Sequence, residues 1–206
     1  VIMLSALIGF LAGIAAYILK SVVYYLSDLL TGGAPAGSVN YWYVVYPILG
    51  IFLTILFIKL IIRDDVKHGI PRILYVISRE NSKMKRHKLF SSLVGSSFTV
   101  GFGASVGLES PIISTGASMG SSFGQMMRMN YRNTTLLIGC GAAGAMASIF
   151  NTPIAAVIFG LEVLMLDLAT SSIVPLLIAS VMGSITTKML LAERILINFE
   201  VTDHFV

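Results

Sequence analysis

The sequence predicts an all-α integral membrane protein, and its composition is the first reason. Hydrophobic residues occupy 56% of the 206 positions, while Asp, Glu, Lys and Arg together occupy 12%. Soluble domains carry about 25% charged residues, so a chain with half that share would expose too much apolar surface to water. A multi-pass protein whose helices contact the lipid bilayer of a cell membrane (plasma or inner) accounts for this composition.

A pair of long apolar segments near the start of the chain is the second reason. Residues 1–30 contain only two charged side chains, Lys20 and Asp28, and exceed the roughly 20 helical residues that cross a bilayer. A loop rich in Gly, Pro and Ser follows, and a second span is predicted from about residue 41 to 62. It begins with a cluster of Tyr and Trp of the kind that lies at membrane interfaces.

Residues 63–88 are predicted to be a basic connection between membrane spans. They hold eight Lys or Arg against three Asp or Glu, a net charge of +5 compared with +4 for the whole chain. Cytoplasmic loops of membrane proteins are enriched in Lys and Arg, so we expect this connection on the cytoplasmic side. A nucleic-acid-binding patch is a poor alternative because the stretch joins two spans.

The rest of the chain is apolar but repeatedly interrupted by Gly and Pro, which is the third reason. Five segments are predicted, at 89–106, 111–127, 134–150, 153–168 and 171–191. Several are shorter than about 20 residues, which indicates helices that stop inside the bilayer and line a protein-enclosed cavity with their ends. Glycines at four-residue spacing, Gly116, Gly120 and Gly124, predict close helix packing rather than chemistry.

Three short sequences share one pattern, in which polar or flexible residues lead to a proline that opens an apolar helix. They are KHGIP at 67–71, GLESP at 107–111 and NTP at 151–153, where Asn151 is the expected N-cap. A helix N-terminus offers free N–H groups and about half a positive charge. Two or more such ends meeting inside the membrane would bind an anion without holding it too tightly to leave.

Glu109 is the most informative of these residues. It lies in an apolar stretch at the start of a predicted helix, and a carboxylate inside a membrane is costly and commonly functional. Its charge would compete with a permeating anion for the same N–H groups, so protonation or movement of Glu109 would open the site. The alternative is a structural carboxylate that only satisfies its own helix.

Sequence patterns typical of enzymes and metal sites are weak in this chain. Ser105 and Ser118 lie in GxSxG strings, but neither follows a recognisable strand and no histidine follows in a suitable context. The one cysteine, Cys140, and three scattered histidines lack metal-ligand spacing. We therefore predict no catalytic residues, no metal and no cofactor apart from the transported ion. An intramembrane hydrolase and a purely structural membrane subunit stay open as alternatives from other classes.

Taken in order, these motifs resemble the CLC family of chloride channels and transporters. The most specific stretch is GCGAAGAMASIFNTPIAAVIFGLEV at 139–163, preceded by HGIP and GLESP. The resemblance implies an inverted-repeat fold of broken, tilted helices, of which this chain, 1–206, is the first half only; a start at Val1 rather than Met fits a fragment. It also implies a homodimer formed through the helices between Pro153 and Leu191, with one pore in each subunit.

The resemblance also assigns roles by position. Glu109 matches the family's external gate, and Gly69, Ile70 and Pro71 match a signature whose backbone helps hold the central anion. The anion-binding residues expected from the resemblance and from the helix ends are His68, Gly69, Ile70, Leu108, Ser110 and Pro111.

Several positions depart from the family pattern. His68 stands where the family has a serine, Leu108 replaces a basic residue and Ser110 replaces a glycine. Because of His68, fluoride, nitrate and bromide stay open as transported anions besides chloride. Glu162 falls one place before the second glutamate of proton-coupled members, and Val163 occupies that place. Because valine cannot relay protons, we expect an uncoupled chloride channel gated by voltage or pH, with a chloride/proton antiporter as the alternative.

Overall fold

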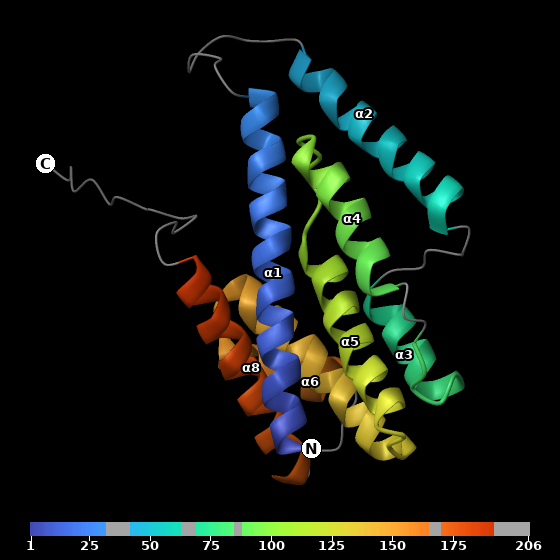
Figure 1. Ribbon diagram of the computed structural model, residues 1–206, viewed down its shortest axis with the longest axis vertical. Coiled ribbons are helices and arrows are strands. Elements are labelled where there is room, and N and C mark those ends of the chain that lie inside the picture. Colours follow the sequence, from blue (N-terminus) through green and yellow to red (C-terminus); the bar gives the residue numbers. More distant parts are fainter. Residues whose placement is uncertain (32–41, 63–68, 85–87, 165–169, 192–206) are drawn as a thin grey trace, which may run out of the picture.

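The computed structural model describes residues 1–31, 42–62, 69–84, 88–164 and 170–191, and its regular elements in these ranges are helices. They are α1 (Ile2–Thr31), α2 (Trp42–Phe57), the short π-helical η1 (Ile58–Ile62), α3 (Ile70–Arg79), α4 (Lys88–Gly101), α5 (Glu109–Met126), α6 (Tyr131–Phe150), α7 (Pro153–Val163) and α8 (Thr170–Leu190). The predicted all-α class is therefore confirmed (Figure 1).

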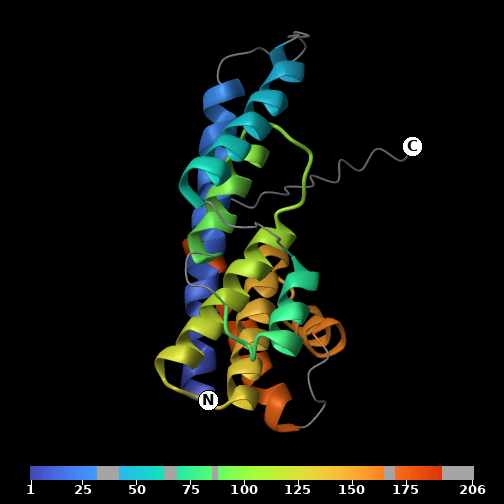
Figure 2. The same cartoon turned by 90° about the vertical axis from the view of Figure 1, so that its right-hand side faces the viewer.

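Helix lengths divide the chain into spanning and broken elements. Among the described residues, three stretches are long and apolar enough to cross a membrane: Ile2–Leu30, Tyr131–Phe150 and Ser172–Leu190. The other helices are shorter or less apolar. Figures 1 and 2 show that α4 is followed by an extended segment, which turns the chain back so that α5 begins partway along α1.

Helices α5 and α6 run antiparallel and in close contact, with glycines between them. A Cβ added to Gly116 would collide with the carbonyl oxygen of Gly141, and a Cβ on Gly141 would collide with that of Gly116. Gly120 and Gly124 make similarly close approaches to Leu137 and Thr134. The four-residue glycine spacing therefore serves backbone contact, as predicted, because glycine lets two helices approach so closely.

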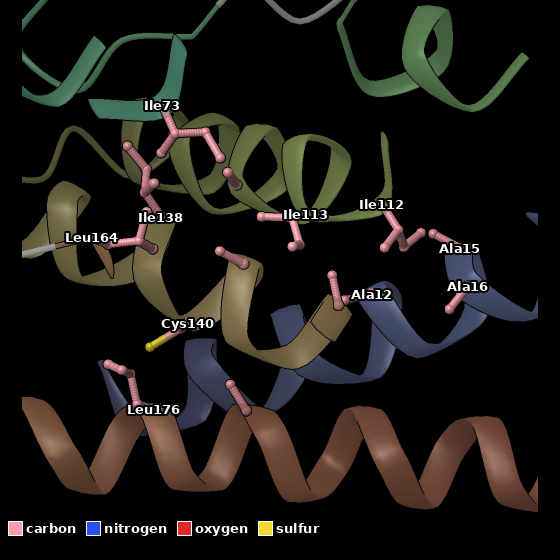
Figure 3. Close-up of a cluster of buried hydrophobic side chains, with 14 of the residues drawn as sticks. Ala12, Ala15, Ala16, Ile73, Ile112, Ile113, Ile138, Cys140, Leu164 and Leu176 are labelled. Carbon is pink, nitrogen blue, oxygen red and sulfur yellow. The ribbon is translucent and has the colours of Figure 1, made fainter. Parts of the chain in front are cut away.

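Helices α1 and α8 pack beside α6 through further small residues. A Cβ on Gly9 would collide with Ala179, and one on Gly13 would lie 2.7 Å from Thr186 Cβ. Ala12, Ala15 and Ala16 of α1 are buried, and Figure 3 shows Ala15 and Ala16 beside Ile112 of α5. The long helix α1 thus packs against both α5 and α6.

The basic stretch 63–88 contains more than a loop. Residues 63–68 and 85–87 lie outside the described residues, but the part between them includes α3, whose Ile73 and Val76 are buried against the core. After α3 the chain turns through Asn81 and Ser82, which both have positive φ values (49° and 59°). Ser121 Oγ of α5 accepts from Met84 N at 2.8 Å and donates to Ser82 O at 2.7 Å. The end of α3 is thereby tied to α5, while the cytoplasmic placement of this stretch stays a prediction.

Candidate functional site

Two of the three proline-led helix starts come together in the structure. Gly69 is the N-cap of α3 and is buried, with φ 95° and ψ −175°. A Cβ built on Gly69 would lie 2.8 Å from Ser110 Oγ in the first turn of α5. The space beside Gly69 is therefore already occupied by the serine side chain, and the N-terminal ends of α3 and α5 are neighbours.

The backbone at both ends follows from the local sequence. A φ of 95° at Gly69 lies in the region that favours glycine. The first α-helical hydrogen bond of α3 joins Ile73 N to Gly69 O at 3.3 Å, and that of α5 joins Ile112 N to Leu108 O at 3.3 Å. Pro71 and Pro111 carry no N–H, so their place in the first turn removes one donor that would otherwise lack a partner.

Backbone donors that lack an acceptor in their own helix lie at the junction. The N-cap residues of the two helices, Gly69 and Leu108, make no side-chain hydrogen bond to the first turn. Ile70 and Arg72 in α3, and Glu109 and Ser110 in α5, precede the first residue that bonds back to the N-cap carbonyl, and their N–H groups have no acceptor within their own helix. Two helix ends with uncapped donors favour an anion through their partial positive charges.

The Glu109 side chain folds back over its own chain. It is exposed, and a Cβ added at Gly107 would collide with the Glu109 carboxylate. The carboxylate therefore rests against the backbone of Gly107, just before α5 begins. A negative group at a helix N-terminus is favourable, and the Glu109 carboxylate lies at that end of α5.

The first turn of α5 is anchored by α4, a contact that sequence reasoning missed. Ser92 is buried, and its Oγ donates to the Pro111 carbonyl oxygen at 3.2 Å. Thr115 Oγ1, one turn along α5, donates to the same oxygen at 3.0 Å. Serines are abundant along α4, and no spacing rule distinguishes the one that reaches α5.

The predicted anion-binding residues that the structure describes have different surroundings. His68 lies outside the described residues. Ile70 is half-buried beside Gly69, and Pro111 is buried. Leu108 packs against the main hydrophobic cluster, so its side chain belongs to the core, whereas Ser110 is exposed at the junction.

The third helix start is arranged differently, and the expectation for Asn151 was wrong. Asn151 is the C-cap of α6 in the left-handed conformation, with φ 59° and ψ 32°. Its Oδ1 accepts from Ser184 Oγ of α8 at 2.5 Å. Thr152 is the N-cap of α7 and makes no side-chain cap bond. Asparagine tolerates left-handed backbone, so the residue serves the turn that ends α6, and α7 packs chiefly on α6 and α8.

Ser118, one of the two serines in the enzyme-like strings, is buried in α5, and its Oγ donates to Met84 Sδ at 3.7 Å. Ser105 is exposed in the extended segment before α5. The hydroxyl of Ser118 thus contacts the chain that follows α3, a packing role. The three histidines lie outside the described residues.

A charged contact inside the helix bundle was also missed. Lys20 of α1 donates from Nζ to Ile149 O at 2.9 Å and to Ser148 O at 3.3 Å. These are carbonyls of the last turn of α6, where no further turn of the helix supplies N–H partners. In the sequence Lys20 was notable only as one of two charges in residues 1–30, and Ile149 lies 129 positions away.

Known proteins resemble this chain in sequence. A "Putative chloride channel protein ClcB-like" of Ralstonia nicotianae is 33% identical over 94 residues, covering 44% of this chain and 22% of the relative. The "H(+)/Cl(-) exchange transporter ClcA" of Klebsiella pneumoniae (strain 342) is 26% identical over 171 residues, covering 79% of this chain and 36% of the relative. The chain thus spans well under half the length of these two relatives.

A solved structure and a family sequence model also match this chain. The crystal structure of a CLC-type fluoride/proton antiporter superposes with a TM-score of 0.73 at 28% identity, covering 92% of this chain and 46% of that one. The sequence model of the family described as "Voltage gated chloride channel" matches residues 50–205. With a match over most of its length and the same fold, the chain belongs to the voltage-gated chloride channel (CLC) family.

Proposed function

We propose that the protein containing this chain transports chloride or a similar small anion across a cell membrane. The observation that carries the proposal is the junction of α3 and α5, where Ser110 Oγ lies against Gly69 and two uncapped helix ends adjoin. Family membership supports the same conclusion. Helix ends bind an anion through partial charges and N–H groups, which is weak enough to let the ion leave again.

Glu109 is the proposed gate. Its carboxylate lies over Gly107 at the entrance of α5, where it competes with an anion for the N–H groups of the first turn. Protonation removes that competition, so opening should increase as the carboxylate takes up a proton. An anion that the membrane potential drives toward the first turn of α5 would also displace the charged Glu109 side chain, because both compete for the same N–H groups.

The mode of transport has two candidates. Val163 stands where a proton-relaying glutamate would be needed, while Glu162, one place earlier, is exposed; this favours an uncoupled channel. The names of relatives favour the second candidate, since the Klebsiella protein is an H(+)/Cl(-) exchange transporter and the solved neighbour is a fluoride/proton antiporter. The neighbour also makes fluoride an anion to test beside chloride.

A homodimer through the helices between Pro153 and Leu191 is part of the proposal. Apolar side chains on α7 and α8 are exposed in the single chain, namely Ile154, Ile158, Val174, Leu177, Ile185 and Met189. A second copy or lipid would cover them. The proposal requires no cofactor and gives Ser105 and Ser118 no catalytic role.

The test is anion efflux from liposomes that contain the purified full-length protein, with external pH recorded and no proton gradient imposed. Chloride efflux without proton movement supports a channel, and chloride efflux with proton uptake in a constant ratio supports an antiporter. Replacing chloride by fluoride, bromide or nitrate ranks the anions. Efflux equal to that of empty liposomes for every anion would refute the proposed function.

A further inference from the structure

The Lys20 ammonium is a positive charge inside the membrane-spanning part of the chain. Lys20 lies within the stretch Ile2–Leu30 and is half-buried. It bonds to the carbonyl oxygens of Ser148 and Ile149 at 3.3 and 2.9 Å. The C-terminal end of a helix carries about half a negative charge, so the ammonium both satisfies these carbonyls and offsets the charge of the α6 end.

Helix packing places this charge level with the junction of α3 and α5. Helices α5 and α6 are antiparallel, with Gly116 against Gly141. Seven residues before Gly116 is Glu109, and seven residues after Gly141 is Ser148, so both lie about 10 Å along their helices from the glycine contact. The last turn of α6 is therefore beside the first turn of α5.

The register of α1 against α5 also places Lys20 beside the first turn of α5. Figure 1 shows α1 and α5 running in opposite directions, and Figure 3 shows Ala16 of α1 near Ile112 of α5. Lys20 is one turn beyond Ala16, and Leu108 is one turn before Ile112. Two independent registers thus bring Lys20 alongside the start of α5.

We propose that Lys20 is an electrostatic positioning residue of the anion pathway, which keeps the negative end of α6 from repelling an anion at the start of α5. Hydrogen bonding to the carbonyls alone would need only a hydroxyl, such as the one α8 supplies to Asn151. Placing an ion inside a membrane is costly, and here the positive charge of Lys20 would offset the negative end of α6 near the anion. This inference rests on the anion transport proposed above.

The size of the effect follows from the spacing. Loss of one unit charge about a helix diameter, roughly 10 Å, from an anion at an effective dielectric of about 20 lowers the affinity for the anion roughly tenfold. The chloride concentration that gives half-maximal flux should therefore rise roughly tenfold in Lys20→Gln, while the maximal flux changes little. Gln keeps an amide donor for the carbonyls but removes the charge.

Flux is measured in liposomes against chloride concentration for the full-length wild-type protein, Lys20→Gln, Lys20→Arg and Lys188→Gln. Lys188 is an exposed cation in the last turn of α8, so its variant is the matched control for loss of one positive charge. We expect Lys20→Gln to shift half-saturation, Lys20→Arg to restore it and Lys188→Gln to leave it unchanged. An unshifted half-saturation in folded Lys20→Gln overturns the inference, as does an equal shift in Lys188→Gln.

The outcomes separate this inference from the proposed function. Absence of flux in the wild-type protein refutes anion transport itself, whereas wild-type flux with unchanged half-saturation in Lys20→Gln refutes only the role of Lys20. If Lys20→Gln does not fold, Lys20→Met replaces it. Failure of both to fold, with Lys20→Arg folded, makes Lys20 a structural requirement only and overturns the electrostatic role.

Discussion

Ser110 of α5 lies against Gly69 of α3, with its Oγ 2.8 Å from the point where a Cβ on Gly69 would stand. This contact joins residues from two helix starts that are 41 positions apart in the chain. A side chain at Gly69 would require the Ser110 hydroxyl to move, and the contact brings two sets of uncapped N–H groups together. The contact therefore defines both the proposed anion site and its vulnerability to substitution.

Gly69→Ala should abolish most anion flux. A Cβ would crowd Ser110, and the backbone conformation at φ 95° and ψ −175° adds a strain of about 1–3 kcal/mol for a non-glycine residue. The matched control is Gly103→Ala, since Gly103 also has a positive φ (87°) but nothing within 4 Å of its Cβ. Flux per folded protein in liposomes separates crowding from strain. Equal flux in the two variants would argue against a site at Gly69.

Glu109→Gln should make flux nearly independent of pH, because the neutral amide cannot compete with an anion as the carboxylate does. Glu162→Gln is the control, since it neutralises another exposed carboxylate, near the end of α7. The measurement is chloride efflux from liposomes as a function of external pH. A pH dependence retained in Glu109→Gln would remove the gate assignment.

Gly116→Ala should destabilise the protein by about 1–3 kcal/mol, the usual cost of overpacking. The added methyl would collide with the Gly141 carbonyl, so α5 and α6 would have to separate. Gly95→Ala in α4 is the control, because its Cβ would meet only Thr54 Cγ2 at 3.5 Å, an ordinary contact. The stability of both variants is measured by heating the proteins in detergent and determining the folded fraction by size-exclusion chromatography. A Gly116→Ala protein as stable as Gly95→Ala would contradict the tight helix contact.

Ser92→Ala should cost about 0.5–1.5 kcal/mol for one lost hydrogen bond and should lower flux further than that loss of stability explains. The reason is that Ser92 holds the Pro111 carbonyl in the first turn of α5. Ser97→Ala is the control, since Ser97 Oγ bonds within α4, to Leu93 O at 2.8 Å. Thermal unfolding and flux are compared for both variants. If both keep wild-type flux when equally folded, α4 does not position the site.

The helical membrane class and the helix starts led by Pro71, Pro111 and Pro153 could be predicted from the sequence, whereas the end of α4 at Gly101 and the role of Asn151 could not. The predictable properties are local, because apolar length, glycine spacing and prolines such as Pro71 and Pro111 act within a few residues along the chain. Gly69 and Glu109 could be singled out for the same reason, since each adjoins a proline-led helix start.

The pairing of helix ends, by contrast, comes from tertiary packing. The fold joins the starts of α3 and α5, assigns Asn151 to the end of α6, and pairs Lys20 with carbonyls 128 and 129 positions away. A free N–H, a left-handed asparagine and a lone lysine can each accept several partners. Which partner each one meets depends on how glycine-lined helices pack in three dimensions, a property of contacts between distant segments that no local pattern encodes.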